Sequence, residues 1–134
     1  MRLFIAVNLT LAFLGECGNR ETDAVKSVLR HIYFEPFEIT IDCIGKFKRN
    51  EGDLWWAGLG GCNELESIRM ELYDKLLEEG FELDIRKFSP HVTLGRQILT
   101  DIKPWRIEPF GETTDKIQLM KSERISGRLT YTPV

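Results

Sequence analysis

The chain has few of the residues that build metal sites and disulfide frameworks. Its 134 residues include three cysteines and two histidines. The cysteines, Cys17, Cys43 and Cys62, are odd in number and widely spaced, which predicts buried free thiols rather than disulfides or a zinc site. The acidic residues show no metal-ligand spacing, and the glycines form no phosphate-binding loop. We therefore expect neither a metal nor another cofactor.

The sequence also lacks a long apolar run. The longest one, Leu3 to Leu14, is interrupted by Asn8 and Thr10, whereas a membrane-spanning helix needs about 20 apolar residues. No small-residue cleavage site of a secretory signal peptide follows it. These absences predict a cytoplasmic protein with no membrane partner.

Neither sign of charge dominates the chain. The net charge is −3, with 43% apolar and 29% charged residues, which is typical of one globular domain spanning residues 1–134 and not of a protein that coats nucleic acid. Residues 1–84 carry −7 and residues 85–134 carry +4. The C-terminal third could attract one phosphate or a short strand, and scattered solvated charges are an equal alternative.

Two helices are expected from their apolar spacing. The first begins at Asn19 or Thr22, and the second begins at Asn63 and ends before Gly80. Their apolar stripes are Val25, Val28, Leu29 and Ile32 in the first, and Leu65, Ile68, Leu72 and Leu76 in the second.

Short strands are expected between and after these helices. They cover residues 36–43, 54–59, 81–85, 91–95, 116–121 and 127–132, and Pro104 and Pro109 indicate a loop between two of them. The run from Leu3 to Leu14 is too long for an ordinary strand of about 5–6 residues, so it is one exceptional strand or two strands with a missing connection. Together these elements predict an α+β fold rather than a doubly wound parallel sheet.

The sequence His91-Val-Thr93 carries the clearest chemical signal. Residues i and i+2 of a strand point to one face, so an imidazole would stand beside a hydroxyl. The imidazole can move protons near neutral pH and the hydroxyl can bind a phosphoryl oxygen, although a structural histidine is the open alternative. His31, at the end of a predicted helix, is assigned a structural role.

Two other groups of residues are candidates for ligand contacts. Of the adjacent Trp55 and Trp56, one is expected in the core and the other on the opposite face, where it could stack on a base. Lys46, Lys48 and Arg49 form a small basic cluster in a turn, which is either a phosphate contact or a solvated loop.

A family resemblance covers nearly the whole chain. Residues Arg86–Arg96, which include Ser89, His91 and Thr93, resemble the second signature of the 2H phosphoesterases, the RNA 2′,3′-cyclic phosphodiesterases once called 2′-5′ RNA ligases. Further segments resemble the landmarks of this family in the same order: 1–7, 9–16, 36–37, 54–59 and 121–131.

The resemblance implies a LigT-like fold with two pseudo-twofold lobes, each an antiparallel sheet with outer helices, around a central cleft. It implies metal-free opening of a 2′,3′-cyclic phosphate to a 2′-phosphate, with 2′-5′ RNA ligation as a side activity. His91 and Thr93 would be one half of the site, with Ser89 and Arg96 as candidate substrate contacts. The ligands implied are RNA 3′ ends or small cyclic nucleotides.

The first family motif departs from the pattern. The family has His-x-Thr-Leu here, whereas this chain has Asn8-Leu9-Thr10-Leu11, so Thr10 matches and Asn8 takes the place of the histidine. The family also places a helix before this motif, which makes the first lobe look truncated. Either the segment is deleted, or a stretch holding the real histidine is absent from the printed chain.

Three functions are compatible with these observations. The first is a cyclic phosphodiesterase with catalytic His91, Thr93 and Thr10, and with Asn8 at the position of the second histidine. The second is a weakened or inactive protein that binds nucleotides or RNA ends, and the third is a structural protein. An apolar flank exposed by a truncated lobe would leave a monomer and a segment-exchanged dimer both open.

Overall fold

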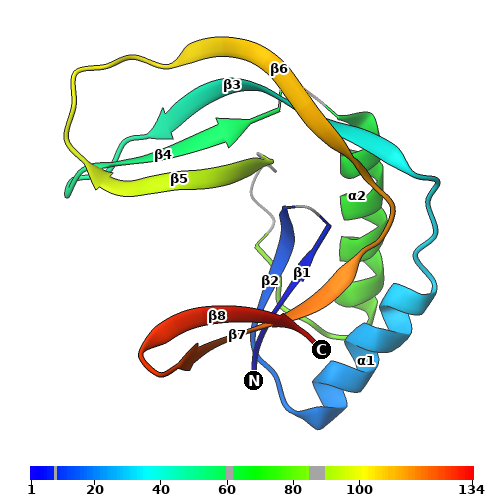
Figure 1. Cartoon of the computed structure of the whole chain (residues 1–134). Helices are drawn as coiled ribbons and strands as arrows, with labels where there is room; N and C mark the ends of the chain where they lie inside the picture. Colours follow the sequence, from blue (N-terminus) through cyan, green and yellow to red (C-terminus); the bar gives the residue numbers. More distant parts are fainter. Residues whose placement is uncertain (8, 60–61, 85–89) are drawn as a thin grey trace.

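Two antiparallel four-stranded sheets form the protein (Figure 1). The computed structural model describes residues 1–7, 9–59, 62–84 and 90–134. The terminal sheet has the order β2-β1-β7-β8, formed by Thr10–Glu16, Arg2–Ala6, Gln118–Ile125 and Arg128–Pro133. The middle sheet has the order β5-β4-β3-β6, formed by His91–Ile98, Asp53–Gly58, Phe37–Phe47 and Trp105–Thr114. The expected α+β class is confirmed.

The two sheets share one pairing pattern but differ in one connection. In both, the strand with the candidate motif is an edge strand, β2 in one sheet and β5 in the other. The helix α2 connects β4 to β5, whereas only residues 7–9 connect β1 to β2. The long apolar run is therefore two paired strands with a very short connection.

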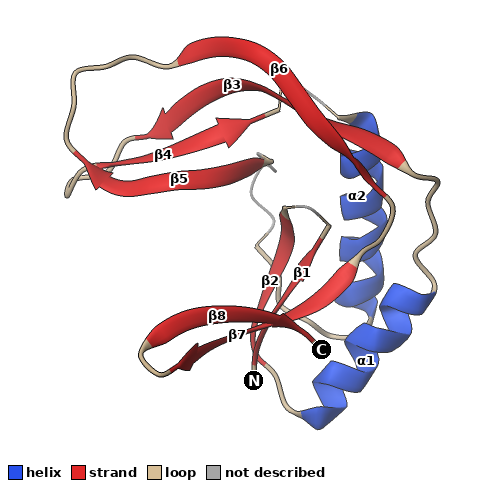
Figure 2. Ribbon diagram, viewed as in Figure 1, coloured by secondary structure: helices blue, strands red, loops and turns tan. Residues whose placement is uncertain are grey.

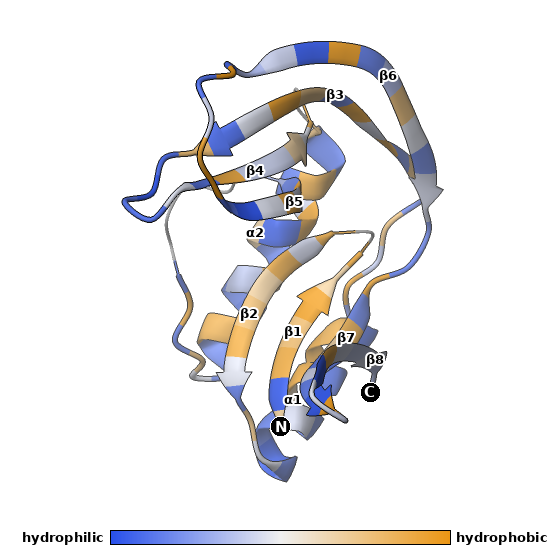
Figure 3. Cartoon of the chain, turned by 60° about the vertical axis from the view of Figure 1, so that its left-hand side comes forward, coloured by the Kyte–Doolittle hydropathy of each residue, from blue (hydrophilic) through white to orange (hydrophobic). Residues whose placement is uncertain are grey.

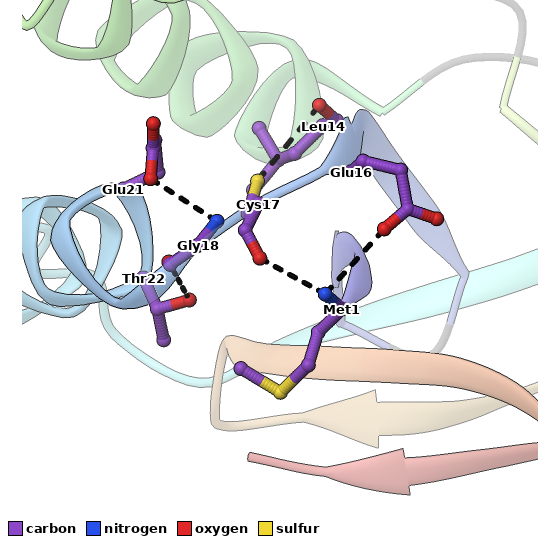
Figure 4. A network of polar contacts seen from close by, with 7 residues as sticks. All are labelled: Met1, Leu14, Glu16, Cys17, Gly18, Glu21 and Thr22. Carbon is purple, nitrogen blue, oxygen red and sulfur yellow. Dashed lines mark hydrogen bonds and ion pairs between the residues drawn. The ribbon is translucent and has the colours of Figure 1, made fainter.

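The first helix, α1, spans Asn19–Arg30. Its N-cap is Gly18 and not Asn19 or Thr22, because the backbone N–H of Gly18 donates to Glu21 Oε2 at 3.1 Å and the Thr22 hydroxyl donates to the Gly18 carbonyl at 2.7 Å (Figure 4). The same close-up shows the amino group of Met1 donating to the carbonyl of Cys17 at 2.9 Å. These contacts fix the end of β2 against the start of β1.

The second helix, α2, spans Asn63–Glu78. Its predicted stripe is buried: Leu65, Ile68, Leu72 and Leu76. The helix begins after Cys62, and Gly80 follows its end with φ of +89°, a conformation that glycine adopts without strain. The predicted C-terminal glycine is thus confirmed.

One core joins both helices to the terminal sheet and to the start of β3. Leu3 and Ile5 on β1 lie in this core with Leu72 of α2 and Val25 of α1. Figure 3 shows both helices behind the terminal sheet. Because side chains alternate along a strand, the opposite face of β1 points away from the helices.

Two strand predictions are wrong. Residues 105–114, expected as part of a loop, form β6, and Pro109 is tolerated there because β6 is an edge strand. Residues 81–84 form no strand. Phe81 and Leu83 instead pack against the core cluster, so burial without strand pairing explains their apolar character.

The sheets and helices form an arch that is open on one side (Figures 1 and 2). The middle sheet lies along the top, the terminal sheet along the bottom, and α2 closes the right-hand side. Among the described residues, no helix is long and apolar enough to cross a membrane.

Candidate functional site

His91 and Thr93 lie at the start of β5, at the edge of the middle sheet. In the antiparallel ladder His91 is opposite Gly58 and Thr93 is opposite Trp56. Directly opposite residues share a face of the sheet, so the imidazole and the hydroxyl stand on the same face as the Trp56 side chain. The predicted juxtaposition of ring and hydroxyl on one strand is therefore present. Thr93 is exposed and His91 is half-buried.

Two aromatic rings surround the imidazole. The Phe47 ring stands edge-on to the His91 ring, with centroids 5.4 Å apart, and the Trp56 ring lies 6.2 Å from it. Phe47 and Trp56 also contact each other at 5.3 Å. Such contacts restrict the rotation of an imidazole. His91 is therefore held by packing at the border of an aromatic cluster.

Two glycines make room for the indole of Trp56. Gly45 is opposite Trp56 on β3, and Gly58 follows two residues later on β4, so all three lie on one face. A Cβ atom at either glycine would collide with the Trp56 ring. The glycines thus let the indole lie flat across the sheet toward His91.

Trp55 occupies the opposite face, as adjacent strand residues must. It is 6% exposed, and its ring lies 5.9 Å from that of Trp105. Lys46 lies over the Trp55 ring and forms an ion pair with Asp53 at 3.3 Å. The expectation of one buried tryptophan is confirmed. Lys46 is a residue of β3 rather than of a turn, and its charge is already paired.

Thr10 begins β2, the corresponding edge strand of the terminal sheet. It is half-buried and lies opposite Ala6 of β1. Figures 1 and 3 show the start of β2 pointing toward the middle sheet, beneath the start of β5. Asn8 and Ser89 lie outside the described residues. Arg96 is exposed on β5 and lies beyond a register shift of the ladder between β4 and β5.

His31 is placed away from this site. It is the C-cap of α1, where its Nδ1 lies 2.8 Å from the Ser27 carbonyl oxygen. This position is the helix end that the sequence predicts for it.

The three cysteines are free. Cys17 is buried as expected, whereas Cys43 and Cys62 are only partly buried. Burial is the main cause that raises the pKa of all three thiols, so they stay protonated near neutral pH.

The described residues form hollows that His91, Thr93 and Thr10 do not line. Two hollows formed by described residues lie elsewhere, one beside Arg49 and Leu99 at the tip of β4 and β5, the other between Tyr33 and the start of α2. Within the described ranges no cluster of three His, Cys, Asp or Glu residues could hold a metal ion.

The sequence did not indicate the aromatic contact of Phe47 with His91. Phe47 follows the predicted strand 36–43, which β3 exceeds by four residues, from Ile44 to Phe47. A period-two pattern could have predicted the longer strand. The pattern of the predicted strand continues beyond Asp42 and puts Cys43, Gly45 and Phe47 on one face.

Comparisons with known proteins agree on one family. A family model described as the 2′-5′ RNA ligase superfamily matches residues 7–123. The RNA 2′,3′-cyclic phosphodiesterase of Archaeoglobus fulgidus is 31% identical over 114 residues, which are 79% of this chain and 64% of that protein. The enzyme of the same name from Aeropyrum pernix is 36% identical over 91 residues, 66% of this chain and 52% of that protein. The chain thus spans about half to two thirds of these relatives.

Solved structures show the same fold. Escherichia coli LigT complexed with 3′-AMP superposes with a TM-score of 0.85 at 24% identity, covering 99% of this chain and 94% of that one. The TT0787 protein of Thermus thermophilus superposes with a TM-score of 0.83 at 21% identity, covering 100% and 95%. The expected two-sheet LigT-like architecture is therefore confirmed.

Proposed function

Because the chain belongs to the 2′-5′ RNA ligase superfamily, we propose that it hydrolyses RNA 2′,3′-cyclic phosphate ends to 2′-phosphates. The observation that carries this proposal is the His91 imidazole beside the Thr93 hydroxyl on one face of an exposed edge strand. The names of the two archaeal relatives favour turnover over binding alone. Residence in the cytoplasm stays a prediction.

Opening the ring needs two proton transfers. The oxygen of a water molecule attacks phosphorus, the bond from phosphorus to O3′ breaks, and the 2′-phosphate remains. The water loses a proton, and O3′ gains one. His91 would carry out one of these transfers, and its aromatic neighbours Phe47 and Trp56 would keep the ring oriented for it.

The threonines would bind the phosphoryl oxygens. Thr93 stands beside His91, and its hydroxyl can donate a hydrogen bond to an oxygen on which charge accumulates. Thr10 would do the same from the terminal sheet, at the start of the other edge strand. With Asn8 in place of a second histidine, solvent would carry the other proton, which costs about 10²–10⁴ in rate.

The ligand would be a small nucleotide or the 3′ end of an RNA. LigT was crystallised with 3′-AMP and with NADP⁺, both of which carry ribose phosphates. On that basis we propose that this chain binds nucleotides. The names of its relatives support RNA 3′ ends as the ligand.

Initial rates of 2′,3′-cyclic AMP hydrolysis test the proposal. We expect the wild-type chain to form 2′-AMP. We expect the rate of hydrolysis by His91→Ala to be lower by a factor of about 10²–10⁴. His31→Ala is the matched control, because it removes the other histidine, which is assigned a capping position on α1. Its rate should equal that of the wild type.

Two results would contradict this proposal, the first its enzymatic activity and the second the role of His91. Wild-type chain that binds the cyclic nucleotide tightly without forming product would be the binding protein considered above. Equal rates for wild type and His91→Ala would remove the proton-transfer role of His91.

A further inference from the structure

A cluster of aromatic rings lies on the terminal sheet, and the proposed chemistry does not use it. Phe4 on β1 contacts Phe13 on β2, with ring centroids 6.3 Å apart, and Tyr131 on β8 at 5.3 Å. Phe13 is 75% exposed and Tyr131 is 57% exposed. We call these three residues the aromatic platform. The rings of Phe13 and Tyr131 are largely open to solvent, whereas Phe4 is half-buried.

The aromatic platform lies on the face that the helices do not cover. Leu3 and Ile5 are buried in the core beneath the helices, so Phe4 between them points the other way. The ladder places Phe4 opposite Phe13, and places Tyr131 opposite Ser122 of β7. The three rings therefore come from separate strands and meet on one side of the sheet.

The same face carries positive charge. Arg2 lies opposite Ser122, and Arg124 follows Ser122 by two residues, so both residues belong to the face of the aromatic platform. The guanidinium of Arg124 donates to the Gly127 carbonyl at 3.3 Å, in the turn that follows β7. Both residues are exposed. Glu16 lies opposite Arg2, but its carboxylate forms an ion pair with the amino group of Met1 at 3.5 Å (Figure 4). The balance of charge beside the rings thus favours an anionic ligand.

The aromatic platform is continuous with the proposed site. Thr10 lies opposite Ala6, which follows Phe4 by two residues on the same face of β1. Two residues of a strand span about 7 Å, which is about two steps of a stacked nucleic acid strand at 3.4 Å each. If the 3′ end of an RNA lies at Thr10, the nucleotides that precede this end therefore reach the rings.

Exposed aromatic rings combined with arginines are typical of surfaces that bind single-stranded nucleic acid. Because most of the Phe13 side chain is exposed, it buries little apolar surface. Core packing therefore does not explain the presence of an aromatic ring at this position. We propose that the aromatic platform, with Arg2 and Arg124, binds the single-stranded RNA that precedes the cyclic phosphate. The bases stack on the rings, and the arginines attract the backbone phosphates. This inference rests on the proposed function and adds to it a preference for oligoribonucleotides over mononucleotides.

Comparison of two substrates tests the preference. We would measure KM for 2′,3′-cyclic AMP and for an adenosine tetranucleotide that ends in a 2′,3′-cyclic phosphate. In Phe13→Ala and in Tyr131→Ala, the preference for the tetranucleotide should fall roughly five- to a hundredfold, the range expected for one lost stacking contact. The matched control is Phe110→Ala, which removes an aromatic ring that is 61% exposed on β6 of the middle sheet. It should leave the preference unchanged.

A binding measurement separates this inference from the proposed function. The probe is a fluorescent tetranucleotide that already ends in a 2′-phosphate, so its affinity does not depend on turnover. Phe13→Ala should weaken its binding by the same factor even if the chain hydrolyses nothing. Arg124→Gln should lower the slope of log affinity against log salt by about 0.7, the value for one phosphate contact on a single strand.

Two outcomes would overturn the inference. One is an equal change for mononucleotide and tetranucleotide in the platform variants. The other is a platform variant that binds the tetranucleotide probe as tightly as the wild type and the Phe110→Ala control. Thermal unfolding of each variant checks that its fold is intact, and the high exposure of Phe13 predicts an unchanged midpoint.

Discussion

The position of a single indole ring depends on two residues without side chains. Trp56 lies across Gly45 and Gly58, and its ring is 6.2 Å from that of His91. The sequence predicted that one tryptophan of the pair would be buried and the other would face the opposite side, but it did not indicate the glycine surface beneath Trp56. That surface depends on the pairing of β3 with β4, which a single strand does not specify.

Gly45→Ala should displace the Trp56 ring. We expect the free energy of unfolding to fall by about 1–3 kcal/mol, as in other overpacked interiors, and the rate of hydrolysis to fall with the loss of ring contact to His91. Urea denaturation and initial rates measure the two effects. In a Trp56→Leu background the same substitution should cost much less stability, because the colliding ring is gone. An equal cost in both backgrounds would contradict the packing described here.

The buried thiol of Cys17 gives a prediction about pH. Burial raises its pKa, so the thiol of the unfolded chain ionises at a lower pH than that of the folded chain. The contribution of this thiol to the free energy of unfolding is fully present below the ordinary thiol pKa of about 8.5. This contribution is lost as the pH rises toward the raised pKa of the folded chain. Cys17→Ala should therefore lose less stability than the wild type between about pH 8 and pH 10 in urea titrations. Parallel losses would contradict this assignment.

At the scale of elements, apolar periodicity predicted the helices well and the strands less well. The stripe of α2 is buried residue for residue. By contrast β6 was missed, because Pro104 and Pro109 suggest a loop and only the sheet order reveals that an edge position tolerates proline. Residues 81–84 were overpredicted, since their apolar side chains pack on the core without pairing. The local spacing of apolar residues therefore predicts which side chains are buried better than it predicts which strands pair.

Leu72→Ala in α2 should lower the free energy of unfolding by about 2–5 kcal/mol, because the side chain is fully buried and its removal leaves a cavity. Met70→Ala is the matched control on the same helix, since Met70 is 66% exposed. Urea denaturation should show less than about 1 kcal/mol of change for that control. A similar loss in both variants would mean that α2 packs by another face.

At the scale of the whole molecule, one core connects the terminal sheet, both helices and the start of β3. We therefore expect residues 1–134 to unfold as a single domain in one cooperative transition. Near-ultraviolet circular dichroism would follow the tryptophans of the middle sheet, and far-ultraviolet circular dichroism would follow the helices. Coincident curves are expected, and two separate midpoints would contradict the single domain.

The candidate site was predictable only in part at this scale. The strand position of His91 and Thr93 followed from the sequence, because the spacing i, i+2 defines one face. The edge position of both motif strands did not, because it arises from pairing between segments far apart, β4 with β5 and β1 with β7. The aromatic platform needs three strands from the two ends of the chain, so no local pattern indicates it.

The most direct test of the account is phosphorus-31 nuclear magnetic resonance of 2′,3′-cyclic AMP incubated with the chain in the presence of EDTA. We predict that the cyclic phosphate signal converts to that of a 2′-phosphate monoester with wild-type protein, and that it persists with His91→Ala. A cyclic signal that persists with the wild type, or a conversion that is undiminished in His91→Ala, would contradict the account.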